Sequence, residues 1–128
     1  QKASLSNLDK TILYKGFLKR DEVAGVLQRC VYLSLDIHPA CPNTVIEALS
    51  CGSPVVAFDT GALKELVTSG AGIIVPYGGD AWELMYPNVD GLIDSISVIQ
   101  DQFTHYADAA SKLAKERFDL QLIVDQYV

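Results

Sequence analysis

The chain has 128 residues, of which 49% are hydrophobic, and its mean hydropathy is +0.19. This composition supplies enough apolar side chains for one buried core, so it predicts a single globular domain and excludes a disordered chain. The net charge of −6 and the pI near 4.7 argue against a nucleic-acid or anionic-membrane surface, because phosphate-rich partners require clustered Lys and Arg.

Cys30, Cys41 and Cys51 are odd in number and lack the spacing of a zinc site. We therefore expect free thiols, no metal centre, a reducing compartment and a cytoplasmic location. No apolar run reaches the ~20 residues that span a bilayer, and residues 1–10 resemble no leader peptide. Because the sequence does not start with Met, we expect a fragment or a processed chain.

Strand and helix patterns alternate through the first half of the chain. Residues 11–14 (TILY) predict a short strand, and a helix is expected to follow with Asp21 as its N-cap. The apolar run 31–35 predicts a buried strand. A second helix is expected to start at Asn43 and to end before Gly52, which stands where a left-handed residue terminates a helix.

The second half continues this alternation. A strand is expected over 55–58, then a turn at 59–61 with a helix of at most two turns, and then a strand over 73–75. Asp80 and Glu83 resemble a capping box, which predicts a helix that contains Trp82. Further helices are expected over 90–100, 103–114 and 120–128. Apolar strands alternating with helices predict an α/β fold, with a parallel sheet covered by helices on both faces.

Two of the expected helices, starting at Asn43 and near Gly61, lie in adjacent units of this fold. Ligands of parallel sheets bind outside the carboxyl ends of the strands, where helix N-termini point. The unpaired N–H groups of both helices would form an anion cradle, and Gly61 would let a phosphate approach the backbone. Glu47 lies one turn into the first helix, so its carboxylate is expected to reach the cradle and accept hydrogen bonds from two vicinal hydroxyls. This combination predicts a nucleotide site.

Simpler explanations apply to the same residues. A glutamate near the start of a helix also complements the helix dipole, and Gly61 can be an ordinary turn residue. His38 is expected in a loop or as a hydrogen-bonded core histidine rather than as a catalyst. Trp82 is expected to serve packing rather than stacking on a ligand.

The run PNTVIEALSCGSPVVAFDTGALKELV, followed by AGIIVP and GGD, resembles the donor-binding motif of retaining, family 4 type glycosyltransferases of the GT-B fold. The segments ILYKGFL, EVAGVLQRCVYLSL and RFDLQLIVDQYV stand in the order of that family. The resemblance covers nearly the whole chain. It implies a Rossmann-like C-terminal domain that binds a nucleotide-sugar donor, of which residues 1–128 form a part that lacks the first strands and the N-terminal acceptor domain.

The resemblance also implies roles for individual residues. Glu47 matches the glutamate that holds the ribose hydroxyls, and no residue is matched with certainty as catalytic. The donor is a nucleotide diphosphate sugar, which is a substrate rather than a cofactor, and no metal is required in principle. The sugar and phosphates would lie along Asn43, Thr44 and Val45 and along Gly61, Ala62 and Leu63, with the base near Gly16, Phe17 and Leu18.

Two positions depart from the family pattern, and the milder change is Ala62 in place of the second glycine of the usual Gly-Gly turn. A second glutamate usually stands eight positions before the one at Glu47, and here that position is Pro39, whose side chain cannot accept a hydrogen bond from the sugar. Either Asp36 or His38 grips the sugar instead, or the domain is a degenerate transferase retained as an interaction or scaffold module. The segment 82–88 resembles an insertion that could serve an acceptor or a partner.

We therefore expect the donor domain of a glycosyltransferase that transfers a hexose to a sugar, lipid or protein acceptor. The isolated fragment is expected to be inactive, because the resemblance implies that the cations that neutralise the diphosphate lie earlier in the parent chain. A flavodoxin-like regulatory domain is disfavoured, since its acidic pocket and placed Lys are missing. No nucleic-acid partner and no membrane span are expected, while peripheral membrane contact through the parent chain and homo-oligomers of the fragment stay open.

Overall fold

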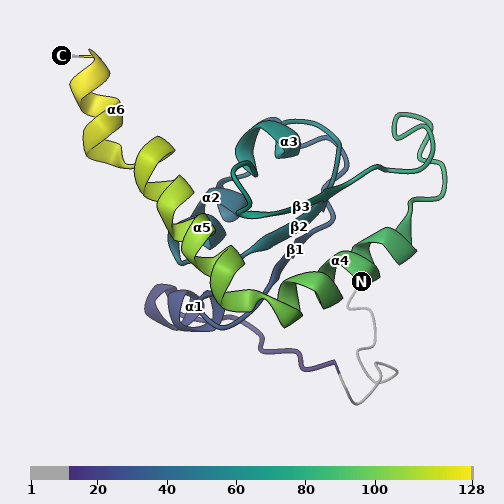
Figure 1. Cartoon of the computed structure of the whole chain (residues 1–128), viewed down its shortest axis with the longest axis horizontal. Helices are drawn as coiled ribbons and strands as arrows, with labels where there is room; N and C mark the ends of the chain where they lie inside the picture. Colours follow the sequence, from purple (N-terminus) through teal and green to yellow (C-terminus); the bar gives the residue numbers. More distant parts are fainter. Residues whose placement is uncertain (1–11, 128) are drawn as a thin grey trace.

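In a computed structural model of the protein, residues 12–127 are described, and they form an α/β domain (Figure 1). The elements follow one another as α1 (Arg20–Leu27), β1 (Tyr32–Ser34), α2 (Asn43–Ser50), β2 (Val55–Phe58), α3 (Leu63–Leu66), β3 (Gly72–Val75), α4 (Val89–Asp101), α5 (Phe103–Arg117) and α6 (Leu120–Tyr127). The predicted start of α2 at Asn43 is confirmed. Gly52 has a φ of +78°, so the predicted left-handed residue after this helix is also confirmed.

The strands form one parallel sheet in the order β1-β2-β3. Tyr32 of β1 lies opposite Val55, and Val55 lies opposite Gly72 of β3. Every residue of the central strand β2 is buried. Parallel strands are buried on both faces only when helices cover both sides, and this explains the continuous apolar run in β2.

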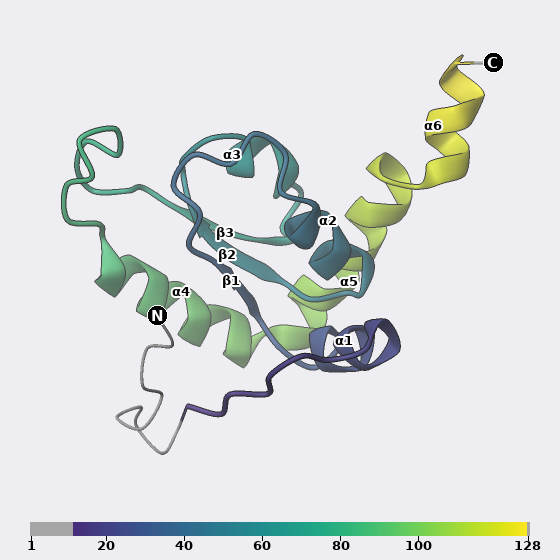
Figure 2. The ribbon, with the colours of Figure 1, turned by 180° about the vertical axis from the view of Figure 1, so that it is seen from behind.

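Two core clusters lie on opposite faces of the sheet, because successive side chains of a strand point to opposite sides. Val55 and Ala57 pack in a cluster with α2, α3 and α5, whereas Val56 and Phe58 pack in a cluster with α4. In Figure 2, α4 lies below the strands and α2 and α3 lie above them. The predicted parallel sheet with helices on both faces is confirmed.

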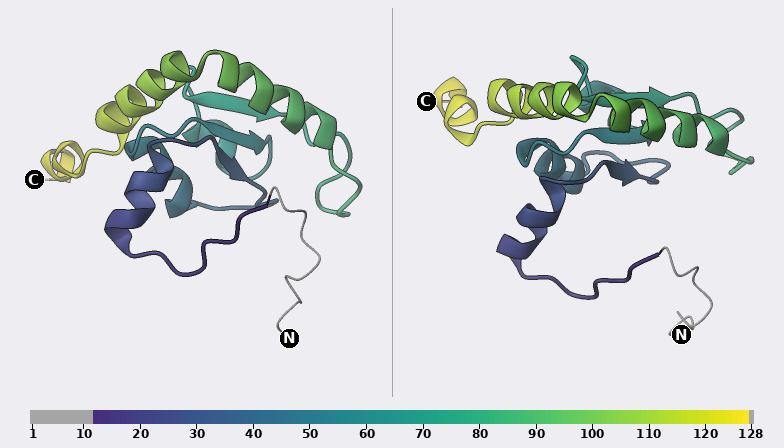
Figure 3. Two further views of the ribbon diagram at one scale, coloured as in Figure 1. Left: turned by 90° about the horizontal axis from the view of Figure 1, so that it is seen from below. Right: turned by 60° about the horizontal axis from the view of Figure 1, so that its bottom comes forward.

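The C-terminal helices wrap around this core. Figure 3 shows α4 and α5 as one continuous arc along the molecule, with α6 beyond its end. Helix α5 contributes Ala110, Leu113 and Ala114 to the cluster shared with α2. Helix α6 projects away from the sheet (Figure 1), and Leu120 at its start is 75% exposed. The predicted last helix is therefore present, with Val128 outside the described residues.

The first predicted strand is wrong in its described part. Residues 12–14 have no strand partner within the described chain, their side chains are exposed, and Thr11 lies outside the described residues. An apolar run becomes a strand only where a neighbouring strand satisfies its backbone groups. The predicted N-cap at Asp21 is also wrong, because α1 starts at Arg20. Lys19 is the N-cap residue, and its N–H donates to Glu22 Oε2 at 2.7 Å.

The predicted helix around Trp82 is wrong as well. Residues 81–84 form a turn, in which Asp80 Oδ1 accepts the N–H groups of Trp82 at 2.8 Å and Glu83 at 3.2 Å. Only half of the expected capping box is therefore present, because the N–H of Asp80 donates to Met85 Sδ at 3.4 Å rather than to the Glu83 side chain. This half closes a turn rather than a helix because Leu84 adopts a left-handed φ of +53°, which interrupts helical geometry.

Candidate functional site

The loops that follow β1 and β2 meet at the carboxyl edge of the sheet. Thr60 Oγ1 donates to the carbonyl oxygen of Asp36 at 3.3 Å, and the N–H of Ala62 donates to that of Pro39 at 2.9 Å. Gly61 has a φ of +53°, and a Cβ on it would fall on the carbonyl oxygen of Pro39. The structure thus gives Gly61 a second reason for being glycine, since the neighbouring loop occupies the space beside its Cα.

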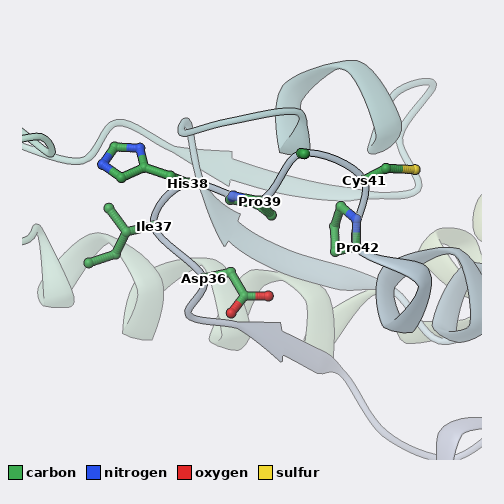
Figure 4. Close-up of a pocket in the computed structure, with 7 residues that line it drawn as sticks. Asp36, Ile37, His38, Pro39, Cys41 and Pro42 are labelled. Atoms are coloured by element: carbon green, nitrogen blue, oxygen red, sulfur yellow. The ribbon is translucent and has the colours of Figure 1, made fainter.

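The loop of residues 36–42 curves from the end of β1 to the start of α2 (Figure 4). In that view the Asp36 carboxylate lies inside the curve, while His38 and Cys41 point away from it to opposite sides. These residues line a hollow of about 510 Å³. A ligand in this hollow would lie between the end of the sheet and the first turn of α2.

The N-terminus of α2 is open toward this loop. Its N-cap residue is Pro42, which offers no side-chain acceptor, and the N–H groups of Val45 and Ile46 turn back to the Pro42 carbonyl at 3.0 and 3.4 Å. The N–H groups of Asn43 and Thr44 have no acceptor within residues 12–127, and both residues are exposed. Free N–H groups at the positive end of a helix dipole attract an anion.

The second half of the predicted cradle is only partly present, because the N–H groups of Gly61 and Lys64 have no acceptor within residues 12–127 but those of Ala62 and Leu63 do. The N–H groups of Ala62 and Leu63 already donate to the carbonyl oxygens of Pro39 and Thr60, at 2.9 and 3.3 Å. In addition, α3 has only four residues, so its dipole is small. The stronger helix dipole at this edge is therefore that of α2, which has eight residues, while the turn at Gly61 lies beside it.

Glu47 faces a groove between α1 and α2. The groove has a volume of about 420 Å³, and Arg20, Val23 and Ile46 line it together with Glu47. Glu47 is exposed, whereas Val45 on the same helix is fully buried in the core. Of these two predicted site residues, only Glu47 offers a side chain to a ligand, and Val45 could contribute its backbone alone.

The predicted base-binding residues Gly16, Phe17 and Leu18 precede α1. Gly16 and Phe17 are exposed, and Leu18 is half-buried. The segment leads directly into Arg20, which lines the groove beside Glu47. The segment is therefore connected through α1 to the groove beside Glu47, but none of its three residues lines that groove.

A second hollow of about 560 Å³ borders the same loop at His38, Pro39 and Ala40. Gly61 and Ala62 line it, together with Asp59, Thr60, Glu65 and Ala81, which were not predicted to contact a ligand. Trp82, the first residue of the segment that resembles an insertion, lines it as well. Asp59 and Thr60 directly follow β2, so their place at the carboxyl end of a strand was the signal that could have identified them. His38 is an exposed loop residue as predicted, and its Nε2 lies 3.1 Å from the carbonyl oxygen of Ala81.

One of the two carboxylates that line this hollow, Asp59, belongs to an ion pair. Lys64 Nζ donates to Asp59 Oδ2 at 2.8 Å. This hydrogen bond, together with the attraction of the carboxylate, raises the pKa of Lys64 above its ordinary value. Within residues 12–127, no three His, Cys, Asp or Glu side chains gather as a metal site. In the same part of the chain, no helix has the length and apolar character needed to cross a membrane.

A family model described as "Glycosyl transferases group 1" matches residues 1–99 of the chain. The match includes every strand of the sheet and the helices α1 to α3, and it ends inside α4. A search of curated proteins gave no match.

Proposed function

Because the chain belongs to the group 1 glycosyl transferases, we propose that its carboxyl sheet edge binds a nucleotide diphosphate sugar. A hexose of this donor would be transferred to a sugar, lipid or protein acceptor. The observation that carries the proposal is the open N-terminus of α2, where the N–H groups of Asn43 and Thr44 lack acceptors within the described residues. Glu47 stands one turn farther along the same helix with its side chain exposed.

The two parts of this helix suit different parts of a nucleotide. The diphosphate would lie at Asn43 and Thr44, where free N–H groups and the helix dipole favour negative charge. The ribose would lie in the groove beside Glu47, whose carboxylate can accept hydrogen bonds from two vicinal hydroxyls. Arg20, across the groove, would lie near the base or the phosphates. During transfer, negative charge develops on the leaving diphosphate, and preorganised N–H groups stabilise it there.

A further domain of the enzyme would complete this site. The hollows at the sheet edge are open to solvent, and Lys64 is already paired with Asp59. A diphosphate needs more positive charge than one helix N-terminus provides. We propose that the remaining cations, and the exclusion of water that strengthens them, come from a second domain closing over this edge.

Isothermal titration calorimetry with uridine, guanosine and adenosine diphosphates tests the donor site. At least one nucleotide is expected to bind, and Glu47→Gln is expected to weaken it about tenfold to a hundredfold, as hydrogen bonds to a charged group contribute about 1.5–3 kcal/mol. Glu116→Gln serves as the matched control, because Glu116 is an exposed glutamate on α5 that pairs with Lys112. The proposal fails if no nucleotide binds, or if the two variants weaken binding equally.

A further inference from the structure

A pair of stacked rings stands at the rim of the 560 Å³ hollow. The ring centroids of His38 and Trp82 are 4.0 Å apart, and their planes differ by 17°. Trp82 is nevertheless 80% exposed, so the indole face that turns away from His38 is open to solvent. An aromatic ring that is fixed on one face and open on the other can act as an anchor for a ligand.

The backbone around Trp82 is held in several places. The N–H of Trp82 donates to Asp80 Oδ1, and His38 Nε2 donates to the carbonyl oxygen of Ala81 at 3.1 Å. The second bond also ties the turn to the loop that leads into α2. The indole is therefore preorganised relative to the sheet edge, and a ligand would lose less binding energy in ordering it.

The far side of the turn is fixed in a strained conformation. Leu84 has a φ of +53°. This left-handed conformation lowers the stability of the fold for any residue with a Cβ. The hydroxyl of Tyr77 donates to the Met85 carbonyl at 2.8 Å, and the N–H of Met85 donates to the Asp80 carbonyl at 3.0 Å. Strain held in place by surrounding bonds is typical of sites that contact a ligand.

The hollow offers hydrogen-bond acceptors beside the indole. Asp59 and Glu65 line it, and the cation Lys64 is bound to Asp59 Oδ2. Two carboxylates disfavour a phosphate here, but they accept hydrogen bonds from hydroxyl groups. The volume lies within the range of about 300–1,000 Å³ typical of small-molecule sites. The ligand favoured by this lining is neutral, rich in hydroxyls and apolar on one face.

A hexopyranose ring has these properties. The C–H groups on one face of the ring carry small positive partial charges, which suit the negative face of an aromatic ring. Its hydroxyls point outward around the edge, where carboxylates can accept their hydrogen bonds. We propose that Trp82, backed by His38, is a platform for a hexopyranose ring whose hydroxyls are bound by Asp59 and Glu65. This inference rests on the proposed function and names the ligand of a hollow that lies outside the places proposed above for the diphosphate and the ribose.

The emission of Trp82 provides a direct test, because it is the only tryptophan of the chain. The chain is titrated with methyl α-glucopyranoside, methyl α-mannopyranoside and methyl α-galactopyranoside, and a saturable change in fluorescence is expected with at least one of them. Saturation-transfer NMR then measures the same glycoside with Trp82→Ala, for which about tenfold weaker binding is expected. His38→Ala is expected to weaken binding too, since it removes the support of the indole.

Tyr86→Ala is the matched control. Tyr86 lies in the segment that follows the same turn and is 86% exposed, but it is not among the residues that line the hollow. Binding by this variant is expected to be unchanged. Circular dichroism of all three variants checks that each one folds. A loss of binding can then be attributed to the substituted side chain and not to unfolding.

The source of the sugar is resolved by titration with uridine and guanosine diphosphate sugars. If the donor sugar binds to Trp82, the nucleotide sugar will change the emission and the nucleotide without a sugar will not. Methyl glycosides will then compete with the nucleotide sugar for binding. An acceptor sugar would let the glycoside bind equally well with nucleotide sugar present. Either outcome supports the platform.

The platform is refuted if neither glycosides nor nucleotide sugars change the emission. It is also refuted if only choline does, since that would indicate a cation site made of the indole and the two carboxylates. The proposed donor site is tested independently of these outcomes, because nucleotide binding is measured by calorimetry with Glu47→Gln and does not depend on Trp82.

Discussion

Replacing Gly61 by alanine tests the contact that joins the two loops of the site. The substituted Cβ would fall on the carbonyl oxygen of Pro39 and lie 2.8 Å from its nitrogen, and the residue would have to keep a φ of +53°. The left-handed backbone costs a residue with a Cβ about 1–2 kcal/mol, and overpacking costs about 1–3 kcal/mol more. We expect the free energy of unfolding to fall by about 2–5 kcal/mol, a large part of the ~5–15 kcal/mol typical of a domain.

Gly70→Ala separates these two contributions. Gly70 has a similar φ of +74°, but a Cβ on it would meet no atom within 4 Å. This variant therefore carries the backbone cost without the clash. Urea unfolding followed by circular dichroism should give a midpoint for Gly61→Ala that lies clearly below that of Gly70→Ala. Equal midpoints would refute the packing of Gly61 against Pro39.

The clash also has a consequence for binding. Pro39 is connected to α2 through the loop whose end carries the open N–H groups, and the Ala62 N–H to Pro39 bond holds that loop in place. A shift of Pro39 in Gly61→Ala should therefore weaken nucleotide binding in the calorimetric assay. Gly70→Ala should bind as tightly as the wild type under conditions where both variants are folded.

Three further predictions concern single elements of the fold. Gly25 lies inside α1 with no atom near its missing Cβ, so Gly25→Ala should stabilise the protein by about 0.5–1 kcal/mol, and an unchanged melting temperature would contradict this. Asn88 caps α4 by accepting the N–H of Gly91 at 3.0 Å. Asn88→Ala should therefore cost about 0.5–2 kcal/mol in urea unfolding, whereas Asn88→Asp should keep the cap. Asp59 raises the pKa of Lys64, so the pair favours the folded state below the ordinary Lys pKa, and this contribution is lost as the pH rises through the higher folded pKa. Lys64 is fully exposed, so the effect of the pair on the free energy of unfolding is small. NMR titration should nevertheless give a lower Lys64 pKa in Asp59→Asn than in the wild type. An unchanged pKa would show that the pair does not form in solution.

The sequence by itself determined the central part of this protein. The continuous apolar run of β2 required burial on both faces, and the pattern from Asn43 to the left-handed Gly52 defined α2 with its correct start. These features depend on the geometry of consecutive residues, which a local pattern records. The open N–H groups of α2 were also predicted from its start, because the first N–H groups of a helix have no partner within the helix.

Contacts between distant segments were decided only by the tertiary structure. Residues 12–14 have the composition of a strand but lack a neighbour within the described chain, and Asp80 makes only half of its predicted capping box, within a turn. The Ala62 N–H binds the Pro39 carbonyl, and Trp82 stacks on His38. Neither pair is visible in a local pattern, because each depends on where two loops end in space. Backbone hydrogen-bond partners and aromatic neighbours are fixed by that placement. The sequence could therefore indicate the edge of the sheet as a candidate site, but not which residues of the folded loops line it.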